Sequence, residues 1–197
     1  MPHIDNTLLH HICINILYGA LGLMVFVILE RMIFYGMLGI KTQQMRSVLR
    51  RSSLSAGAAP YFPGRDVLST SVMEFLNKQS REGGITRAQV EDLSSALFLR
   101  VSGKVNARLW LLDTIVTAAP LLGLLGTILG IMDTFDALSS GGISDPAAVS
   151  RGIAAALLAT AIGIGTALLG LVAFNVLHRQ ADVITEGFKE TLLTVTH

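Results

Sequence analysis

Two long apolar segments in the last third of the chain restrict its fold more than any other feature. They cover roughly residues 109–138 and 146–178, and each exceeds the ~20 residues that a helix needs to cross the hydrocarbon core of a bilayer. A third apolar run covers residues 12–40 and is interrupted by Glu30 and Arg31. The three runs predict an all-α, polytopic membrane protein with three transmembrane helices.

The distribution of charge predicts how these helices are oriented. Only 15% of the 197 residues are charged and 51% are hydrophobic, whereas soluble domains average about 25% charged residues. The first 29 residues contain no Lys or Arg, but residues 41–108 contain eleven Lys and Arg against five Asp and Glu. Basic loops are retained in the cytoplasm. We therefore expect residues 1–11 and the turn 139–145 outside, and 41–108 and 179–197 inside.

The basic region between the first two spans is expected to be helical and to extend from the membrane. Residues 67–81 predict a helix that the glycine pair 83–84 stops. A capping box, Thr-x-x-Gln from Thr86, then opens another helix. Its apolar positions keep helical spacing into the second span, so we expect one continuous helix from Thr86 to Leu138, about 80 Å long. The cytoplasmic part would be a small helical bundle rather than an enzyme domain.

Short sequence signals mark the remaining boundaries. Asp145 and Pro146 predict the start of the third span, with Asp as the N-cap and Pro at the first helical position. Apolar positions between Val183 and Leu192 predict an amphipathic C-terminal helix. The first span has no basic cluster before it and no small-residue cleavage site after it, so we expect an uncleaved helix rather than a signal peptide.

Polar and small residues inside the last two spans are the candidate functional residues. Thr127 and Thr160 are expected at similar depth on adjacent helices, where they could line a hydrated route; alternatively each hydroxyl binds its own i−4 carbonyl. Asp113 could exchange protons at the inner mouth, or could be a hydrated carboxylate at the membrane edge with Arg108 as its feasible partner. Small residues let helices approach closely, and the expected packing positions are Gly123, Gly126, Gly130, Ala156, Gly163 and Ala167.

The sequence offers no pattern for catalysis or for a metal. Cys13 is the single cysteine, and the pair His10-His11 has no third ligand nearby in the sequence. The hydroxyl residues form no arrangement of nucleophile, base and orienting group. The basic residues are interleaved with acids and do not alternate with aromatics, which is not typical of nucleic-acid binding. We therefore expect neither an enzyme nor a cofactor-binding or nucleic-acid-binding protein.

Two ordered motifs resemble a known family. The run LDTIVTAAPLLGLLGTILGIM at 112–132 looks like the second transmembrane signature of the MotA/TolQ/ExbB proton-channel family, and GIAAALLATAIG at 152–163 looks like the third. The resemblance is close over residues 109–180. Outside this range it rests on the expected arrangement of the helices. Three expected spans match the ExbB/TolQ branch, in an ExbB-like form, whereas MotA-like members have four.

The resemblance implies a homopentamer in the bacterial inner membrane, with a periplasmic N-terminus and a cytoplasmic C-terminus. Its central pore would enclose helices of an ExbD/TolR-like single-span partner whose aspartate binds and releases the proton. Thr127 and Thr160 match the threonines that face this aspartate. The complex would act on a TonB- or TolA-like protein for outer-membrane nutrient transport.

One position departs from the family pattern. Many members carry glutamate where this sequence has Ala155. Either the partner's aspartate and the threonines are sufficient for proton transfer, or Asp113 takes the place of that glutamate on the inner side, or this chain moves ions differently. Alternative functions are a TolQ-like role in envelope maintenance and a non-conducting scaffold, in contact with membrane lipid, whose small-residue faces serve only oligomerisation. An autonomous channel is disfavoured because no charged residue is expected at the midplane of the spans.

Overall fold

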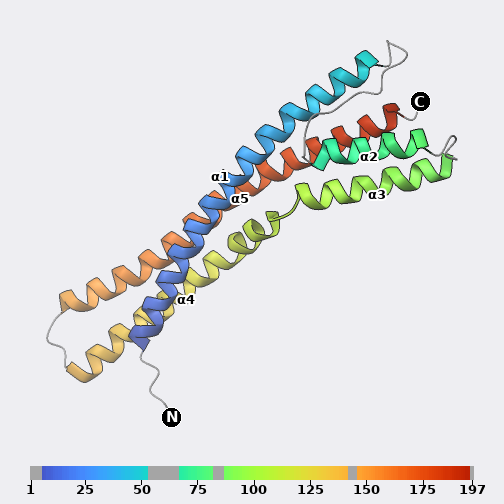
Figure 1. Ribbon diagram of the computed structural model, residues 1–197. Coiled ribbons are helices and arrows are strands. Elements are labelled where there is room, and N and C mark those ends of the chain that lie inside the picture. Colours follow the sequence, from blue (N-terminus) through green and yellow to red (C-terminus); the bar gives the residue numbers. More distant parts are fainter. Residues whose placement is uncertain (1–5, 53–66, 82–86, 142–145, 196–197) are drawn as a thin grey trace. The chain divides into compact units, whose positions relative to one another are not determined.

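The computed structural model describes residues 6–52, 67–81, 87–141 and 146–195, and this part of the chain is built from five helices (Figure 1). They are α1 (Asn6–Ser52), α2 (Val67–Arg81), α3 (Arg87–Val105), α4 (Leu109–Gly141) and α5 (Pro146–Val195). Three of them contain segments that are long and apolar enough to cross a membrane, namely Leu8–Thr42, Leu109–Ser139 and Pro146–Glu190. The predicted all-α architecture with three such helices is confirmed.

Two helices are longer than the apolar runs that predicted them. α1 has 47 residues and α5 has 50, which corresponds to about 70 and 75 Å at ~1.5 Å per residue. The helix expected over residues 179–197 is therefore not separate, because α5 runs without a break from Pro146 to Val195. Residues 171–186 contain neither glycine nor proline, so nothing in them interrupts the backbone hydrogen bonds. The expected N-cap Asp145, the glycine pair 83–84 and Thr86 lie outside the described residues.

The chain divides into two compact units, each with its own contacts. The first unit contains residues up to Leu29 and Arg108–Asn175, and the second contains Glu30–Ala107 and the residues from Val176 onwards. In the first unit the beginning of α1 packs against α4 and against the first part of α5. A side chain at Gly170 of α5 would meet both Met24 of α1 and Val116 of α4 at 2.7 Å. The three apolar segments are thus in mutual contact in this unit.

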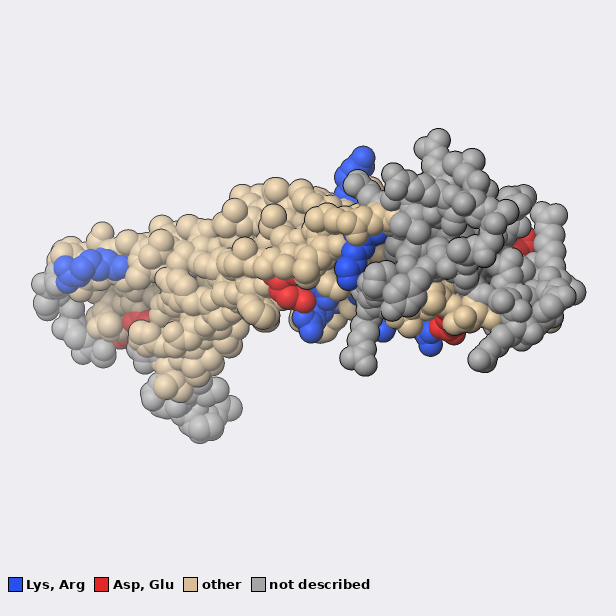
Figure 2. Space-filling view, turned by 45° about the horizontal axis from the view of Figure 1, so that its top comes forward, with Lys and Arg blue, Asp and Glu red and all other residues tan. Residues whose placement is uncertain are grey.

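The outer side of these helices is apolar. Phe26 of α1, Leu121 of α4 and Val172 of α5 keep 63%, 67% and 67% of their surface exposed. Figure 2 shows an extended tan surface on which few charged side chains lie. Soluble monomers rarely expose apolar patches of more than a few hundred Å². This surface fits contact with lipid or with other membrane helices.

The second unit is a small helical bundle. α2 packs on α3, and Arg100 of α3 forms a salt bridge of 2.8 Å with Glu74 of α2. The ammonium of Lys189 on α5 lies 5.8 Å from the ring centroid of Phe98 on α3. Leu97, Val101 and Phe188 are buried between these helices.

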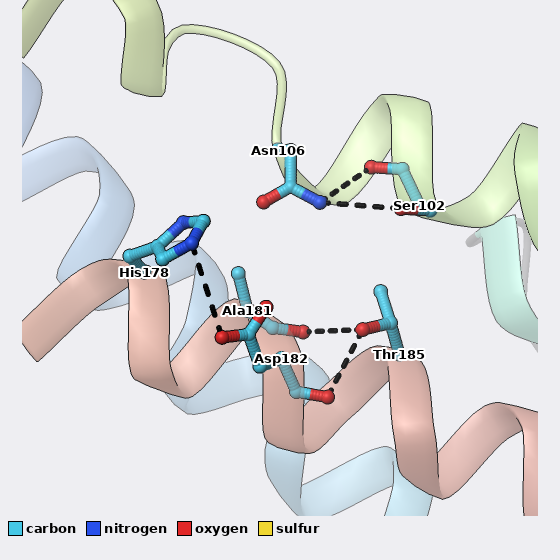
Figure 3. A network of polar contacts seen from close by, with 6 residues as sticks. All are labelled: Ser102, Asn106, His178, Ala181, Asp182 and Thr185. Atoms are coloured by element: carbon cyan, nitrogen blue, oxygen red, sulfur yellow. Dashed lines mark hydrogen bonds and ion pairs between the residues drawn. The ribbon is translucent and has the colours of Figure 1, made fainter. Parts of the chain in front are cut away.

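The predicted continuous helix from Thr86 to Leu138 is wrong, because the chain breaks between Val105 and Leu109. Arg108 has φ 71°, a left-handed conformation that is uncommon for residues other than glycine and that ends the helical path. Before it, the side-chain amide of Asn106 donates to the carbonyl oxygen of Ser102 at 3.0 Å and contacts its Oγ at 3.3 Å (Figure 3). The last turn of α3 is therefore closed by a side chain.

Two side chains of α1 complete this helix end. The Tyr35 hydroxyl donates to the carbonyl oxygen of Val105 at 2.8 Å, and Nη1 of Arg31 donates to the same oxygen at 3.3 Å. Both side chains are buried. Carbonyls in the last turn of a helix have no partner within it, and a cation is favourable there. Arg31, one of the two charged residues that interrupt the first apolar run, thus helps to cap α3.

Replacing Tyr35 by phenylalanine is expected to lower the thermal stability of the protein in detergent. The change removes the 2.8 Å bond to Val105, and one lost hydrogen bond of this kind costs about 0.5–1.5 kcal/mol. Tyr18→Phe is the matched control, since Tyr18 lies on the same helix with 52% of its surface exposed. Melting temperatures measured by differential scanning fluorimetry should fall only for Tyr35→Phe. Equal values for the two variants would contradict the role of this bond.

Candidate functional site

The site begins with a close approach of the α4 and α5 backbones. A Cβ atom added to Gly163 would lie 2.6 Å from the carbonyl oxygen of Ala119 and 3.0 Å from Cα of Gly123, and one added to Gly123 would lie 2.9 Å from the carbonyl oxygen of Ala159. Only glycine fits at either position without moving a helix. The predicted packing residues Gly123 and Gly163 therefore face each other at the crossing.

The contact continues one turn at a time toward the α4 C-terminus. A Cβ atom on Gly126 would meet Cβ of Ala159 at 3.0 Å, and one on Gly130 would meet Cβ of Ala156 at 2.9 Å. Ala156 is fully buried, as its predicted packing role requires, whereas Ala167 is half-buried. The small residues bring the two helices close enough for their side-chain hydroxyls to reach across.

Thr127 and Thr160 meet at this interface. Their Oγ1 atoms are hydrogen-bonded to each other. Oγ1 of Thr127 also lies 2.9 Å from the carbonyl oxygen of Ala156 on α5, and Oγ1 of Thr160 lies 3.1 Å from the carbonyl oxygen of Gly123 on α4. Each hydroxyl therefore reaches a carbonyl of the opposite helix. The structure brings the two predicted threonines together.

The other threonines of these spans behave differently. Thr114, Thr134 and Thr166 each donate to the carbonyl four residues earlier in their own helix, at 2.8 Å. These three residues therefore follow the alternative in which each hydroxyl binds the i−4 carbonyl of its own helix. Thr127 also reaches its own i−4 carbonyl, at 3.2 Å, but has the shorter contact with Ala156.

The hydroxyl pair and its carbonyls form a chain with two proton orders. A hydroxyl has one proton to donate, whereas a carbonyl only accepts. In one order Thr160 donates to Thr127, which donates to the carbonyl of Ala156. In the other, Thr127 donates to Thr160, which donates to the carbonyl of Gly123. Rotation of the two hydroxyls reverses the chain without creating a charge. Both protons are used in either order, so the pair then offers a lone pair to a neighbouring group, and it offers a donor only when one hydroxyl turns away from its carbonyl.

Asp113 is not part of this cluster. Its side chain is exposed near the start of α4, about 21 Å along the helix axis from Thr127. Ala155 is also exposed, next to the buried Ala156. The position where many family members carry glutamate therefore lies on the surface of this chain, outside the packed interface.

Two polar residues of α1 that the sequence pattern did not indicate as site residues contact the same part of α4. Nδ1 of His10 lies 3.1 Å from the carbonyl oxygen of Gly126, and the Cys13 thiol lies 3.2 Å from the carbonyl oxygen of Leu122. Their spacing of three residues places both on one face of an otherwise apolar helix, which is the sequence signal that could have found them. In the described parts of the helices, no group of three His, Cys, Asp or Glu side chains is placed to hold a metal ion.

Comparisons with known proteins agree with this architecture. Residues 66–190 match the model of the MotA/TolQ/ExbB proton channel family. An ExbB homologue from Methanothermobacter thermautotrophicus is 29% identical over 171 residues, which is 86% of this chain and 61% of the relative. The biopolymer transport protein ExbB of Helicobacter pylori is 42% identical over 85 residues, covering 43% of this chain and 59% of the relative.

A Tol-Pal system protein is also similar. TolQ of Pseudomonas aeruginosa is 32% identical over 114 residues, covering 56% of this chain and 49% of TolQ. The chain thus spans between about half and three fifths of the length of these relatives. The family match includes α2, α3, α4 and most of α5, and therefore both threonines and the glycine crossing. The chain belongs to the MotA/TolQ/ExbB proton channel family, in its ExbB/TolQ branch.

Proposed function

We propose that this chain is the scaffold subunit of a proton-driven motor in the bacterial inner membrane. In this proposal its N-terminus is periplasmic, its C-terminus is cytoplasmic, and five copies surround a pore. The observation that carries the proposal is the hydroxyl chain of Thr127 and Thr160, held between two backbone carbonyls at the α4–α5 crossing. Within a membrane such uncharged polar groups provide hydrogen bonds that lipid cannot offer.

The hydroxyl chain fits a partner that supplies the titrating group. Threonine does not ionise near neutral pH, but its hydroxyl can either donate to a carboxylate or accept from a carboxylic acid. In either proton order the pair can accept from a protonated aspartate, and it can donate to an ionised aspartate when one hydroxyl turns away from its carbonyl. We therefore infer an ExbD/TolR-like single-span partner whose membrane aspartate faces the pair. We also propose that Asp113, which is exposed near the start of α4, is a proton acceptor at the inner mouth.

The proton motive force would then be used to move a third protein. One elementary charge that crosses 100 mV supplies ~2.3 kcal/mol, so useful force requires repeated passages coupled to movement of the partner. The target would be a TonB-like protein for outer-membrane nutrient transport, in line with the ExbB relatives. The TolQ relative supports the alternative of a TolA-like target in envelope maintenance.

Co-purification and flux measurements test this function. The full chain, expressed with a single-span protein that carries a membrane aspartate, should co-purify with it and conduct protons in liposomes under an imposed pH gradient and potential. Replacing the partner's aspartate by asparagine should stop the flux. A replacement of the proton gradient by a Na⁺ gradient distinguishes the coupling ion. A stable complex without flux of either ion would favour the non-conducting scaffold.

A further inference from the structure

The first helix reaches the hydroxyl site through the backbone of α4. Nδ1 of His10 lies 3.1 Å from the carbonyl oxygen of Gly126, which directly precedes Thr127. A carbonyl oxygen can only accept, so Nδ1 carries the proton of this bond. A Cβ atom on Gly130 would lie 2.9 Å from Cε1 of His10. The imidazole can therefore lie against α4 because Gly130 has no side chain.

Cys13 makes a second contact one turn further along α1. Its buried thiol donates to the carbonyl oxygen of Leu122 at 3.2 Å. The carbonyls of Leu122 and Gly126 are one helical turn apart on α4. Between them in the sequence lies Gly123, whose carbonyl oxygen is 3.1 Å from Oγ1 of Thr160 and 3.2 Å from Oγ1 of Thr127. Three carbonyls of one short segment thus receive side-chain bonds, two from α1 and one from the threonine pair.

This segment of α4 needs such support. Pro120 lies inside the helix and removes a backbone hydrogen bond, and Gly123, Gly126 and Gly130 follow it, each of which is less favourable in a helix than alanine. The rotation of this weakened segment about its axis decides where the carbonyl of Gly123 points. Side-chain bonds from another helix restrict that rotation.

We propose that His10 is a positioning residue of the hydroxyl site. Its Nδ1–H, assisted by the Cys13 thiol, holds the Leu122–Gly126 segment of α4 at the rotation in which the carbonyl of Gly123 meets Thr127 and Thr160. This inference rests on the proposed function and gives the first helix a direct part in it. The first span thus orients the groups that handle the proton, in addition to anchoring the chain in the membrane.

A matched pair of substitutions tests the hydrogen bond separately from packing. His10→Asn and His10→Leu introduce side chains of nearly the same shape, but only asparagine keeps an N–H donor close to the position of Nδ1. In liposomes that contain the complex with its single-span partner, proton flux should fall about fivefold or more for His10→Leu, as expected for one lost hydrogen bond, and should be largely retained for His10→Asn. His11→Leu, at the exposed neighbouring position, is the control and should leave the flux unchanged. Equal flux for the two His10 variants would overturn the proposal.

A spectroscopic measurement separates this inference from the proposed function. Solid-state NMR of the complex, with labelled histidine and glycine, should show a protonated Nδ1 for His10, and a Gly126 carbonyl shift that changes in His10→Leu but not in His10→Asn. An unprotonated Nδ1, or a carbonyl that responds to neither substitution, would refute the role of His10 while flux in the unmodified complex continues. The expected NMR result together with an unmodified complex that never conducts protons would instead refute the proposed function.

Discussion

Replacing Thr160 by valine should strongly reduce proton flux through the complex while leaving the complex intact. Valine has nearly the same shape as threonine, so the α4–α5 packing is preserved. It has no hydroxyl, so the chain between the carbonyls of Ala156 and Gly123 is interrupted in both proton orders. We expect flux in liposomes to fall by roughly tenfold or more, equivalent to an increase of about 1.4 kcal/mol or more in the barrier.

Thr166 provides a control for this experiment in the same helix. Its hydroxyl donates to the carbonyl of Ile162 at 2.8 Å, within its own helix, so Thr166→Val removes a hydroxyl without touching the site. We expect its flux to stay close to that of the unmodified protein. Thr160→Ser keeps the hydroxyl and should restore most of the flux. Normal flux in Thr160→Val would remove Thr160 from the mechanism and would favour a scaffold that does not conduct.

The substitution Gly163→Ala should destabilise the protein more than any other single methyl group added to its membrane-spanning glycines. The new Cβ atom would lie 2.6 Å from the carbonyl oxygen of Ala119 and 3.0 Å from Cα of Gly123, and both are backbone atoms that cannot rotate away. The helices must separate, and overpacking of this kind costs about 1–3 kcal/mol. Because Thr160 lies one turn away, its bond to Gly123 should lengthen, and proton flux should fall together with the melting temperature in detergent.

Gly165 lies two residues further along the same helix and is the matched control. A Cβ atom at this position meets nothing within 4 Å. Gly165→Ala should therefore be neutral or slightly stabilising, because alanine is favoured over glycine in a helix by about 0.5–1 kcal/mol. Melting temperatures measured for the two variants in the same detergent decide the question. If Gly163→Ala melts like Gly165→Ala, the helices do not cross as closely as these distances require.

The substitutions Gly163→Ala and Thr160→Val distinguish two functions that are both compatible with small residues along α4 and α5. A non-conducting scaffold requires the glycine crossing but not the hydroxyls, so it predicts that Gly163→Ala is harmful and that Thr160→Val affects only stability. A proton-conducting subunit requires both. The two readouts, melting temperature and flux, therefore distinguish functions that the sequence pattern alone left open.

The sequence by itself determined the features that depend on local composition. Three apolar runs gave the three candidate membrane helices, because the length of a run compared with the thickness of a bilayer is a local property. The helix over residues 67–81 and the start of α5 at Pro146 were also predicted from local sequence, because their signals lie within or next to the helices themselves. The spacing of Thr127 and Gly123 on one helix, and of Thr160 and Gly163 on the next, indicated which faces would meet.

Only the tertiary structure decided which carbonyl each polar side chain binds. Val105 receives Arg31 and Tyr35 from 74 and 70 residues away, and these bonds accompany the break that made the expected long helix wrong. Gly126 receives His10 from 116 residues away. Every residue carries a carbonyl acceptor, so the amino-acid sequence does not indicate which carbonyl accepts a side-chain hydrogen bond. The acceptor is decided only when the packed helices bring the donor and one carbonyl within hydrogen-bond distance.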